Sequence, residues 1–150
     1  MEKESAVLLI FTGGTISMSE DPATGALRPI DFTRLQEYLP ELKQIGIRIK
    51  TLPFNPLIDS SDVQPDTWEK IALTIKDSYD DFDGFVVLHG TDTMAYTASA
   101  LSFMLENLSK PVIFTGAQLP IGMMRSDAKE NLLTAIEIAS AKENGQALVP

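Results

Sequence analysis

The stretch Ala6-Val7-Leu8-Leu9-Ile10-Phe11 is a continuous apolar run, and it ends in the polar segment Thr12-Gly13-Gly14-Thr15. A run without polar alternation is typical of a strand that is buried on both faces, as in a parallel sheet. The segments Gly84–Leu88 and Val112–Thr115 repeat this pattern, and each is also followed by glycines and polar residues. We therefore expect the three runs to be strands of one buried sheet.

The rest of the chain predicts helices alternating with these strands. A surface loop rich in Gly, Pro, Ser and Asp is expected at residues 17–29, and a further strand at 45–52. Helices are expected at residues 31–38, 65–75, 95–105 and 127–143. The last of them has capping-box spacing between Asp127 and Glu130, and Gly145 is expected to end it. Residues 147–150 predict the start of another strand.

This alternation predicts a single α/β domain over residues 1–150. The expected fold is a doubly wound, mostly parallel sheet with helices on both faces. The chain is 44% hydrophobic and 22% charged, which is a composition that supports a buried core and argues against disorder.

Composition and charge exclude several classes of function. The chain has no cysteine and one histidine, so it offers no disulfide and no site built from several histidines, and we expect no metal. Its net charge of -9 argues against a nucleic-acid groove and against an anionic membrane surface. The N-terminal apolar run is too short, and too acidic at its start, for a signal peptide, which predicts a cytoplasmic location.

Polar residues gather where the expected strands end, whereas the opposite connections are ordinary solvated turns. The four polar loops read Gly13-Gly14-Thr15, Asp59-Ser60-Ser61-Asp62, Gly90-Thr91-Asp92-Thr93 and Gly116-Ala117-Gln118. Open parallel sheets bind their ligands at this edge, and glycines let backbone N–H groups approach a ligand closely. The residues alone therefore predict a small polar ligand among hydroxyls and carboxylates.

Each feature also has an ordinary structural explanation. Gly13-Gly14 can serve only a tight turn, and Thr91 can be only a helix cap. A single histidine such as His89 is more often a buried, hydrogen-bonded core residue than a catalyst.

In combination, these segments resemble the two signatures of the bacterial-type L-asparaginase family. The matching segments are residues 11–16 (FTGGTI), 88–95 (LHGTDTMA), 115–120 (TGAQLP) and 126–127 (SD). The resemblance covers nearly the whole chain, and residues 59–62 and 96–104 are most similar to the cytoplasmic, type I branch. It implies a flavodoxin-like N-terminal domain of an enzyme that hydrolyses the side-chain amide of L-asparagine to L-aspartate and ammonia, without a cofactor.

The resemblance also implies a role for individual residues. Thr15 matches the nucleophile that forms an acyl-enzyme, and Thr91 and Asp92 match the second catalytic threonine and its neighbouring carboxylate. Asp59, Ser60 and Ser61 match the segment that grips the α-carboxylate and α-amino groups of the substrate. The backbone of Ala117 matches a contact to the reacting amide.

Two departures from the family pattern bear on activity. The family carries a tyrosine on the loop after the first strand, and residues 24–29 contain none. The relay lysine and the C-terminal domain, which completes active sites across a subunit interface, would follow Pro150. The resemblance thus implies that this chain is an inactive portion of a full-length homo-oligomer, a dimer or a tetramer.

Two alternative functions remain open at this point. One is the amidase component of a tRNA-dependent amidotransferase, whose relatives carry an N-terminal extension before the Gly-Gly-Thr motif. The other is a non-catalytic nucleotide- or flavin-binding module, although the chain lacks a phosphate-binding fingerprint. Complex formation with a partner subunit and tRNA would favour the first alternative. Thermal stabilisation by aspartate favours the amidase, and stabilisation by a nucleotide favours the binding module.

Overall fold

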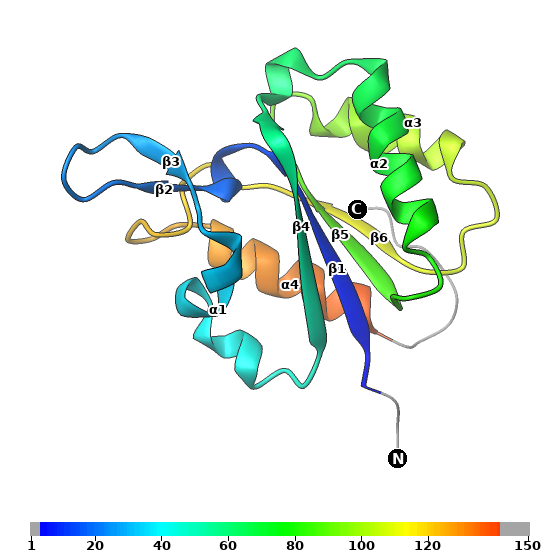
Figure 1. The fold of residues 1–150 in the computed structure, drawn as a ribbon, viewed down its shortest axis with the longest axis horizontal. Coiled ribbons are helices and arrows are strands. Elements are labelled where there is room, and N and C mark those ends of the chain that lie inside the picture. The colour runs from blue at the N-terminus through cyan, green and yellow to red at the C-terminus, as the bar shows by residue number, and fades with distance from the viewer. Residues whose placement is uncertain (1–3, 142–150) are drawn as a thin grey trace.

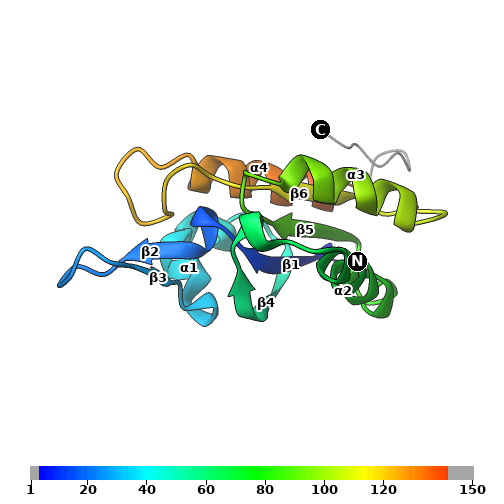
Figure 2. The same cartoon turned by 90° about the horizontal axis from the view of Figure 1, so that it is seen from above.

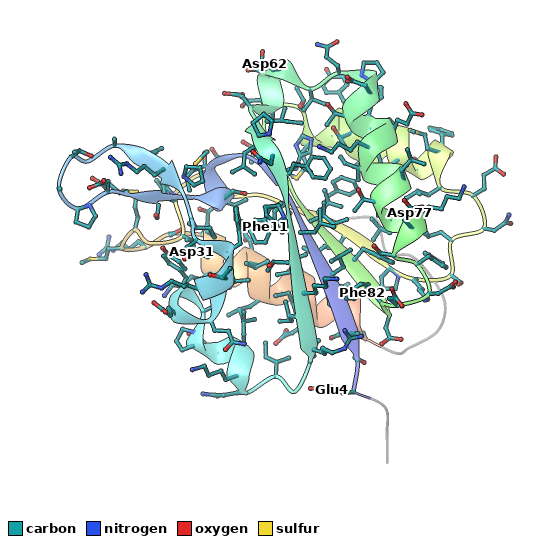
Figure 3. All side chains as sticks on the ribbon, in the orientation of Figure 1. Glu4, Phe11, Asp31, Asp62, Asp77 and Phe82 are labelled. Carbon is teal, nitrogen blue, oxygen red and sulfur yellow. The ribbon has the colours of Figure 1, made fainter. Side chains whose placement is uncertain are left out.

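A four-stranded parallel sheet organises the part of the chain that the structure, a computed structural model, describes, which is residues 4–141. Its strands lie in the order β4 (Arg48–Ile58), β1 (Ala6–Gly13), β5 (Gly84–Leu88) and β6 (Val112–Thr115). All three neighbouring pairs are parallel, so the four carboxyl ends meet at one edge of the sheet. Figure 3 marks both edges, with Asp62 beyond the carboxyl end of β4 and Phe82 at the amino end of β5.

Helices cover both faces of this sheet, as the sequence predicts (Figures 1 and 2). One face carries α2 (Pro65–Asp77) and α3 (Met94–Met104), and the other carries α1 (Leu35–Tyr38) and α4 (Ala128–Ser140). Every residue of β1 is buried, and its side chains alternate between two hydrophobic cores. Leu8 packs with the helices α2 and α3, while Leu9 packs with α1 and α4.

The predicted bounds of the second strand are wrong at both ends. The sequence predicts residues 45–52, whereas β4 begins at Arg48 and continues to Ile58 through Pro53 and Pro56. Proline lacks the N–H group that donates to a neighbouring strand, so it interrupts the hydrogen bonds of a central strand. An edge strand tolerates proline because one of its sides has no neighbour. β4 is an edge strand with β1 as its neighbour, and it therefore extends to the polar residues that follow Ile58.

The expected surface loop at residues 17–29 contains a β-hairpin that its composition concealed. β2 (Met18–Glu20) pairs antiparallel with β3 (Leu27–Pro29), and the pair projects from the body of the molecule (Figures 1 and 2). Asp21 closes the turn because its side chain accepts the N–H of Ala23, and Gly25 adopts a φ of 69° that few other residues tolerate. The turn residues are those of a loop, and each strand is too short to show alternation.

The helical predictions hold in place but not in detail. Asp31 accepts the N–H of Thr33, as expected of a cap, but the helix it starts is a 3-10 turn (Phe32–Arg34) that runs into α1. Further 3-10 turns are Thr15–Ser17, Pro40–Lys43 and Ser60–Asp62. α4 ends at Ser140, so the predicted end near residue 143 is wrong, whereas Gly145 and the strand expected at 147–150 lie outside the described residues.

Candidate active site

The polar loops that follow the strands are joined to one another at the carboxyl edge of the sheet. The first contact is between the loop after β1 and the loop after β5. A Cβ atom on Gly14 would lie 2.5 Å from both the N and the Cα of Gly90, and that of Gly13 would lie 1.9 Å from the carbonyl oxygen of Ile58. Gly14 also has a φ of 79°, so both space and backbone conformation require glycine at this position.

The loop after β4 joins the same centre through Ser60. A Cβ atom on Gly90 would lie 2.4 Å from Ser60 Oγ. The hydroxyl of Thr93 donates a hydrogen bond of 2.6 Å to the carbonyl oxygen of Ser60. Three polar loops that are far apart in the sequence therefore meet around Gly90.

The loop after β6 completes the arrangement on the other side of Thr91. The carboxamide of Gln118 donates a hydrogen bond of 3.3 Å to Thr91 Oγ1. A Cβ atom on Gly116 would lie 3.1 Å from Thr91 Cγ2 and 2.7 Å from the carbonyl oxygen of His89. Thr91, which lies on the loop after β5, therefore contacts the loop that follows the neighbouring strand β6.

The structure brings the seven predicted site residues to this edge in different environments. Thr15 is partly buried in the first position of its 3-10 turn, and Thr91 and Asp92 are exposed. The buried members of the set are Ser60 and Ala117, and the exposed members of the substrate-binding segment are Asp59 and Ser61.

The Asp59 carboxylate is already used within its own loop. Its Oδ1 accepts hydrogen bonds from the backbone N–H and the hydroxyl of Ser61, at 2.9 and 2.8 Å. These two bonds, the backbone bond first, hold the pKa of Asp59 below its usual value. The carboxylate therefore stays ionised at neutral pH and keeps Ser61 oriented.

One residue at this edge has a role that the sequence did not predict. The side chain of Asp127 accepts no backbone N–H of α4, so the predicted capping box with Glu130 is wrong. Its carboxylate instead accepts the N–H groups of Gln118 and Leu119, at 2.9 and 3.1 Å. Asn131 on the next turn of the same helix donates to the carbonyl oxygen of Gly116. The resemblance of residues 126–127 to a family segment was the available signal.

The interpretation of His89 as a core histidine agrees with the structure. Its side chain is 1% exposed and lies directly below the Gly90–Thr93 loop. Nδ1 lies 2.7 Å from the carbonyl oxygen of Gly90, and Nε2 lies 2.9 Å from the hydroxyl of Thr97. His89 supports the loop that carries Thr91 from within the core.

This edge of the sheet combines hydroxyl groups, the exposed carboxylate of Asp92 and closely approaching backbone. Such a combination suits nucleophilic attack on a small polar substrate. A hollow of about 720 Å³ lies elsewhere, between α2 and the segment after α3 at the amino edge of the sheet. Across residues 4–141, no three His, Asp or Glu side chains cluster in a way that could hold a metal ion. In the same residues, no helix has the length and apolar character needed to cross a membrane.

Known families and proteins match this chain over almost its whole length. Residues 6–149 match the family model described as asparaginase, N-terminal. L-asparaginase 1 of Escherichia coli K12 is 49% identical over 145 residues, which covers 93% of this chain and 41% of that protein. A glutamyl-tRNA(Gln) amidotransferase component of Saccharolobus islandicus is 39% identical over 148 residues, covering 97% of this chain and 33% of that one.

Solved structures agree with these sequence matches. L-asparaginase I from Vibrio cholerae has a TM-score of 0.86 and 42% identity, and the match covers 99% of this chain and 44% of that one. A probable cytoplasmic L-asparaginase from Campylobacter jejuni has a TM-score of 0.81 and 30% identity, covering 97% of this chain and 43% of that one. The chain thus spans less than half the length of these relatives.

Proposed function

This chain belongs to the asparaginase family through its N-terminal domain, and from that membership we propose that it is the threonine-bearing portion of an L-asparagine amidohydrolase. The observation that carries the proposal is the meeting of the Gly13–Thr15 and Gly90–Thr93 loops around Gly90. Because the chain covers 41% of L-asparaginase 1, we further propose that catalysis requires polypeptide beyond these 150 residues.

Two of the three proposed catalytic residues act in sequence on the amide. The hydroxyl oxygen of Thr15 forms a bond to the amide carbon, the C–N bond breaks, and ammonia leaves after receiving a proton. Water then attacks the resulting ester, which releases aspartate and returns the proton to Thr15. Thr91 accepts the proton of the attacking group in each step and passes it on to a base.

The remaining site residues act through charge and hydrogen bonds. Asp92, the third proposed catalytic residue, stabilises positive charge on the base that serves Thr91 or on the substrate's ammonium, and Asp59 offers negative charge to the α-amino group of the substrate. Ser60 offers hydrogen-bond donors to the α-carboxylate, and Ser61 joins it when its hydroxyl turns from Asp59 to the substrate. The backbone of Ala117 offers its polar atoms to the side-chain amide. Neither a metal nor an organic cofactor is needed for this chemistry.

The proposal extends to assembly and location. We propose a homo-oligomer, a dimer or a tetramer, that acts in the cytoplasm on L-asparagine without contacting nucleic acid or membrane. Helix α3 supports an oligomer because it carries no charged residue, and its aromatic side chains Tyr96 and Phe103 are 70% and 86% exposed. The name of the Campylobacter relative supports the location.

The test joins residues 1–150 to the C-terminal part of Escherichia coli L-asparaginase 1 and measures ammonia release from L-asparagine. We expect the fusion to be active and the chain alone to be inactive. In the fusion, Thr15→Ala and Thr91→Ala each lower kcat/KM by at least about 100-fold, because each removes a group that takes part in proton or acyl transfer. Thr74→Ala is the matched control, since that threonine lies on α2 away from this edge. Activity retained by Thr15→Ala would falsify the assignment of the nucleophile.

The match to the amidotransferase component favours one further candidate, an amidase that supplies ammonia to a tRNA-dependent partner. The net charge of -9 argues against contact with tRNA. The rate of ammonia release, measured with and without tRNA, distinguishes the two candidates. The amidotransferase candidate requires tRNA to change this rate. An asparaginase releases ammonia at the same rate with and without tRNA.

A further inference from the structure

The single tryptophan and the single histidine of the chain are joined by one threonine beneath the candidate active site. Trp68 Nε1 on α2 donates a hydrogen bond of 3.0 Å to Thr97 Oγ1 on α3. Thr97 Oγ1 lies 2.9 Å from His89 Nε2, and His89 Nδ1 lies 2.7 Å from the carbonyl oxygen of Gly90. Thr97 and His89 are almost completely buried, so the two bonds of the imidazole lie out of reach of solvent, whereas the bond from Trp68 is partly buried.

The chemistry of the two end groups fixes the direction of every bond between them. The Gly90 carbonyl can only accept, so His89 Nδ1 carries the hydrogen. Burial lowers the pKa of His89, with the bond to Gly90 opposing this, so the ring is neutral and Nε2 accepts. Thr97 must then donate its hydroxyl hydrogen to Nε2, and its oxygen accepts from the indole N–H of Trp68, which can only donate.

This use of a helical threonine is specific, as two other hydroxyls in the chain demonstrate. A threonine or serine inside a helix commonly donates to the carbonyl one turn earlier. Thr74 follows this pattern with Lys70, and Ser99 follows it with Ala95. Thr97 instead directs its hydrogen sideways to the imidazole.

The chain of bonds ends at the residue where three polar loops meet. The backbone of Gly90 lies against Gly14 and Ser60, and the next residue is Thr91. The carbonyl of a trans peptide and the following N–H point in opposite directions. A Gly90 carbonyl bound to the buried ring therefore sends the Thr91 N–H away from the core and sets the orientation of the Thr91 backbone.

We propose that Trp68, Thr97 and His89 form a directional hydrogen-bond chain that positions the Gly90–Thr93 loop. His89 is thus a positioning residue and does not touch the substrate. The bond chain itself stands on the geometry, whereas its value for amide hydrolysis rests on the proposed function.

The first measurement needs no variant, because ¹⁵N NMR of the 150-residue chain reports on one imidazole only. We expect the neutral tautomer with the hydrogen on Nδ1 and a slowly exchanging ring N–H. An Nε2–H tautomer, or a ring that carries two hydrogens at pH 7, overturns the proposal.

The second measurement is amide hydrogen exchange in Thr97→Val, which keeps the shape of the side chain and removes its hydroxyl. We expect exchange to accelerate at least tenfold at the His89 and Tyr96 amides, which donate to the carbonyl oxygens of Thr115 and Thr93 at the two ends of the loop, while the amides of β1 and β5 stay within threefold. Thr97→Ser restores the wild-type rates because it restores the hydroxyl. Thr74→Val is the control on α2, and it leaves the loop unchanged.

A fourth variant covers the case in which Thr97→Val does not fold. Trp68→Phe removes the terminal donor, and it is expected to accelerate exchange at His89 and Tyr96 by a smaller factor. Unchanged exchange at His89 and Tyr96, or equal acceleration throughout the sheet, overturns the positioning role. Neither readout involves asparagine, so a failure here leaves the proposed function untouched, and an inactive enzyme leaves the bond chain untouched.

Discussion

The neutral ring of His89 makes stability depend on pH in a window where few other groups titrate. Burial lowers its pKa below the usual 6.5, so the folded chain resists a proton that the unfolded chain binds. Stability is therefore complete above pH 6.5 and is lost as the pH falls through that value, with a slope of at most about 1.4 kcal/mol per pH unit.

We expect the unfolding free energy in urea to decrease from pH 6.5 to pH 5 in the wild type and to be flatter in His89→Asn. The pKa values of Asp59 and Asp127 are also lowered, but these carboxylates stop stabilising the fold only when the pH falls below their usual value of 3.8, which is a separate pH range. A wild-type slope no steeper than that of the variant contradicts a neutral, buried ring.

Single residues also set the limit of what the sequence could predict. Thr15, Thr91 and Asp92 were predicted because they stand in segments that resemble family signatures, and the loops that carry them meet in the structure. The role of Asp127 was missed because a carboxylate before a helix is usually a cap. Only the three-dimensional position of the Gln118 and Leu119 amides reveals its use.

At the level of single elements, the two residues just before α4 act as a clamp on the loop after β6. Asp127 accepts two N–H groups of that loop, and Ser126 donates its hydroxyl to the carbonyl oxygen of Leu119. The backbone bonds to Gln118 and Leu119 lower the pKa of Asp127, although burial opposes them. The clamp is therefore present at neutral pH and is lost when the carboxylate is protonated in acid.

Asp127→Asn is expected to accelerate hydrogen exchange at the amides of Gln118 and Leu119, because a carboxamide is a weaker acceptor than a carboxylate. The matched control is Glu130→Gln, which makes the same chemical change one turn further along α4. Equal exchange rates in Asp127→Asn and the wild type would show that the clamp does not hold the loop.

The elements best predicted from the sequence are those whose physics is local. β5 and β6 have the predicted bounds because each is a short apolar run in a buried position. β4 was cut short because the tolerance of its prolines depends on its place at the edge of the sheet, which no local pattern contains. The β2–β3 hairpin was missed because its strands are three residues each.

For the whole molecule, one sheet separates two cores that must unfold together if the domain is cooperative. Leu8 and Leu9 are neighbours in β1, are fully buried, and belong to different cores. Trp68 lies beside the core of Leu8, so its fluorescence reports on that side.

We expect Leu8→Ala and Leu9→Ala each to lower the unfolding free energy by about 2–5 kcal/mol. Both should shift the urea midpoint of Trp68 fluorescence and of far-UV circular dichroism by the same amount, since small domains unfold in one step. Leu27→Ala on the exposed strand β3 is the control and changes stability by less than about 0.5 kcal/mol. A fluorescence transition unmoved by Leu9→Ala would mean that the two cores unfold separately.

The contact between Gly14 and Gly90 has a consequence for anyone who wishes to redesign the site. The two loops touch there peptide against peptide, with no side chain between them to trim or enlarge. Randomising the Gly14 codon should return glycine alone among folded clones, since even a methyl group there would overlap the backbone of Gly90, whereas a methyl group on Gly90 would meet the side chain of Ser60. New substrate preferences must therefore come from the side chains that border this seam, such as Ser61 and Gln118.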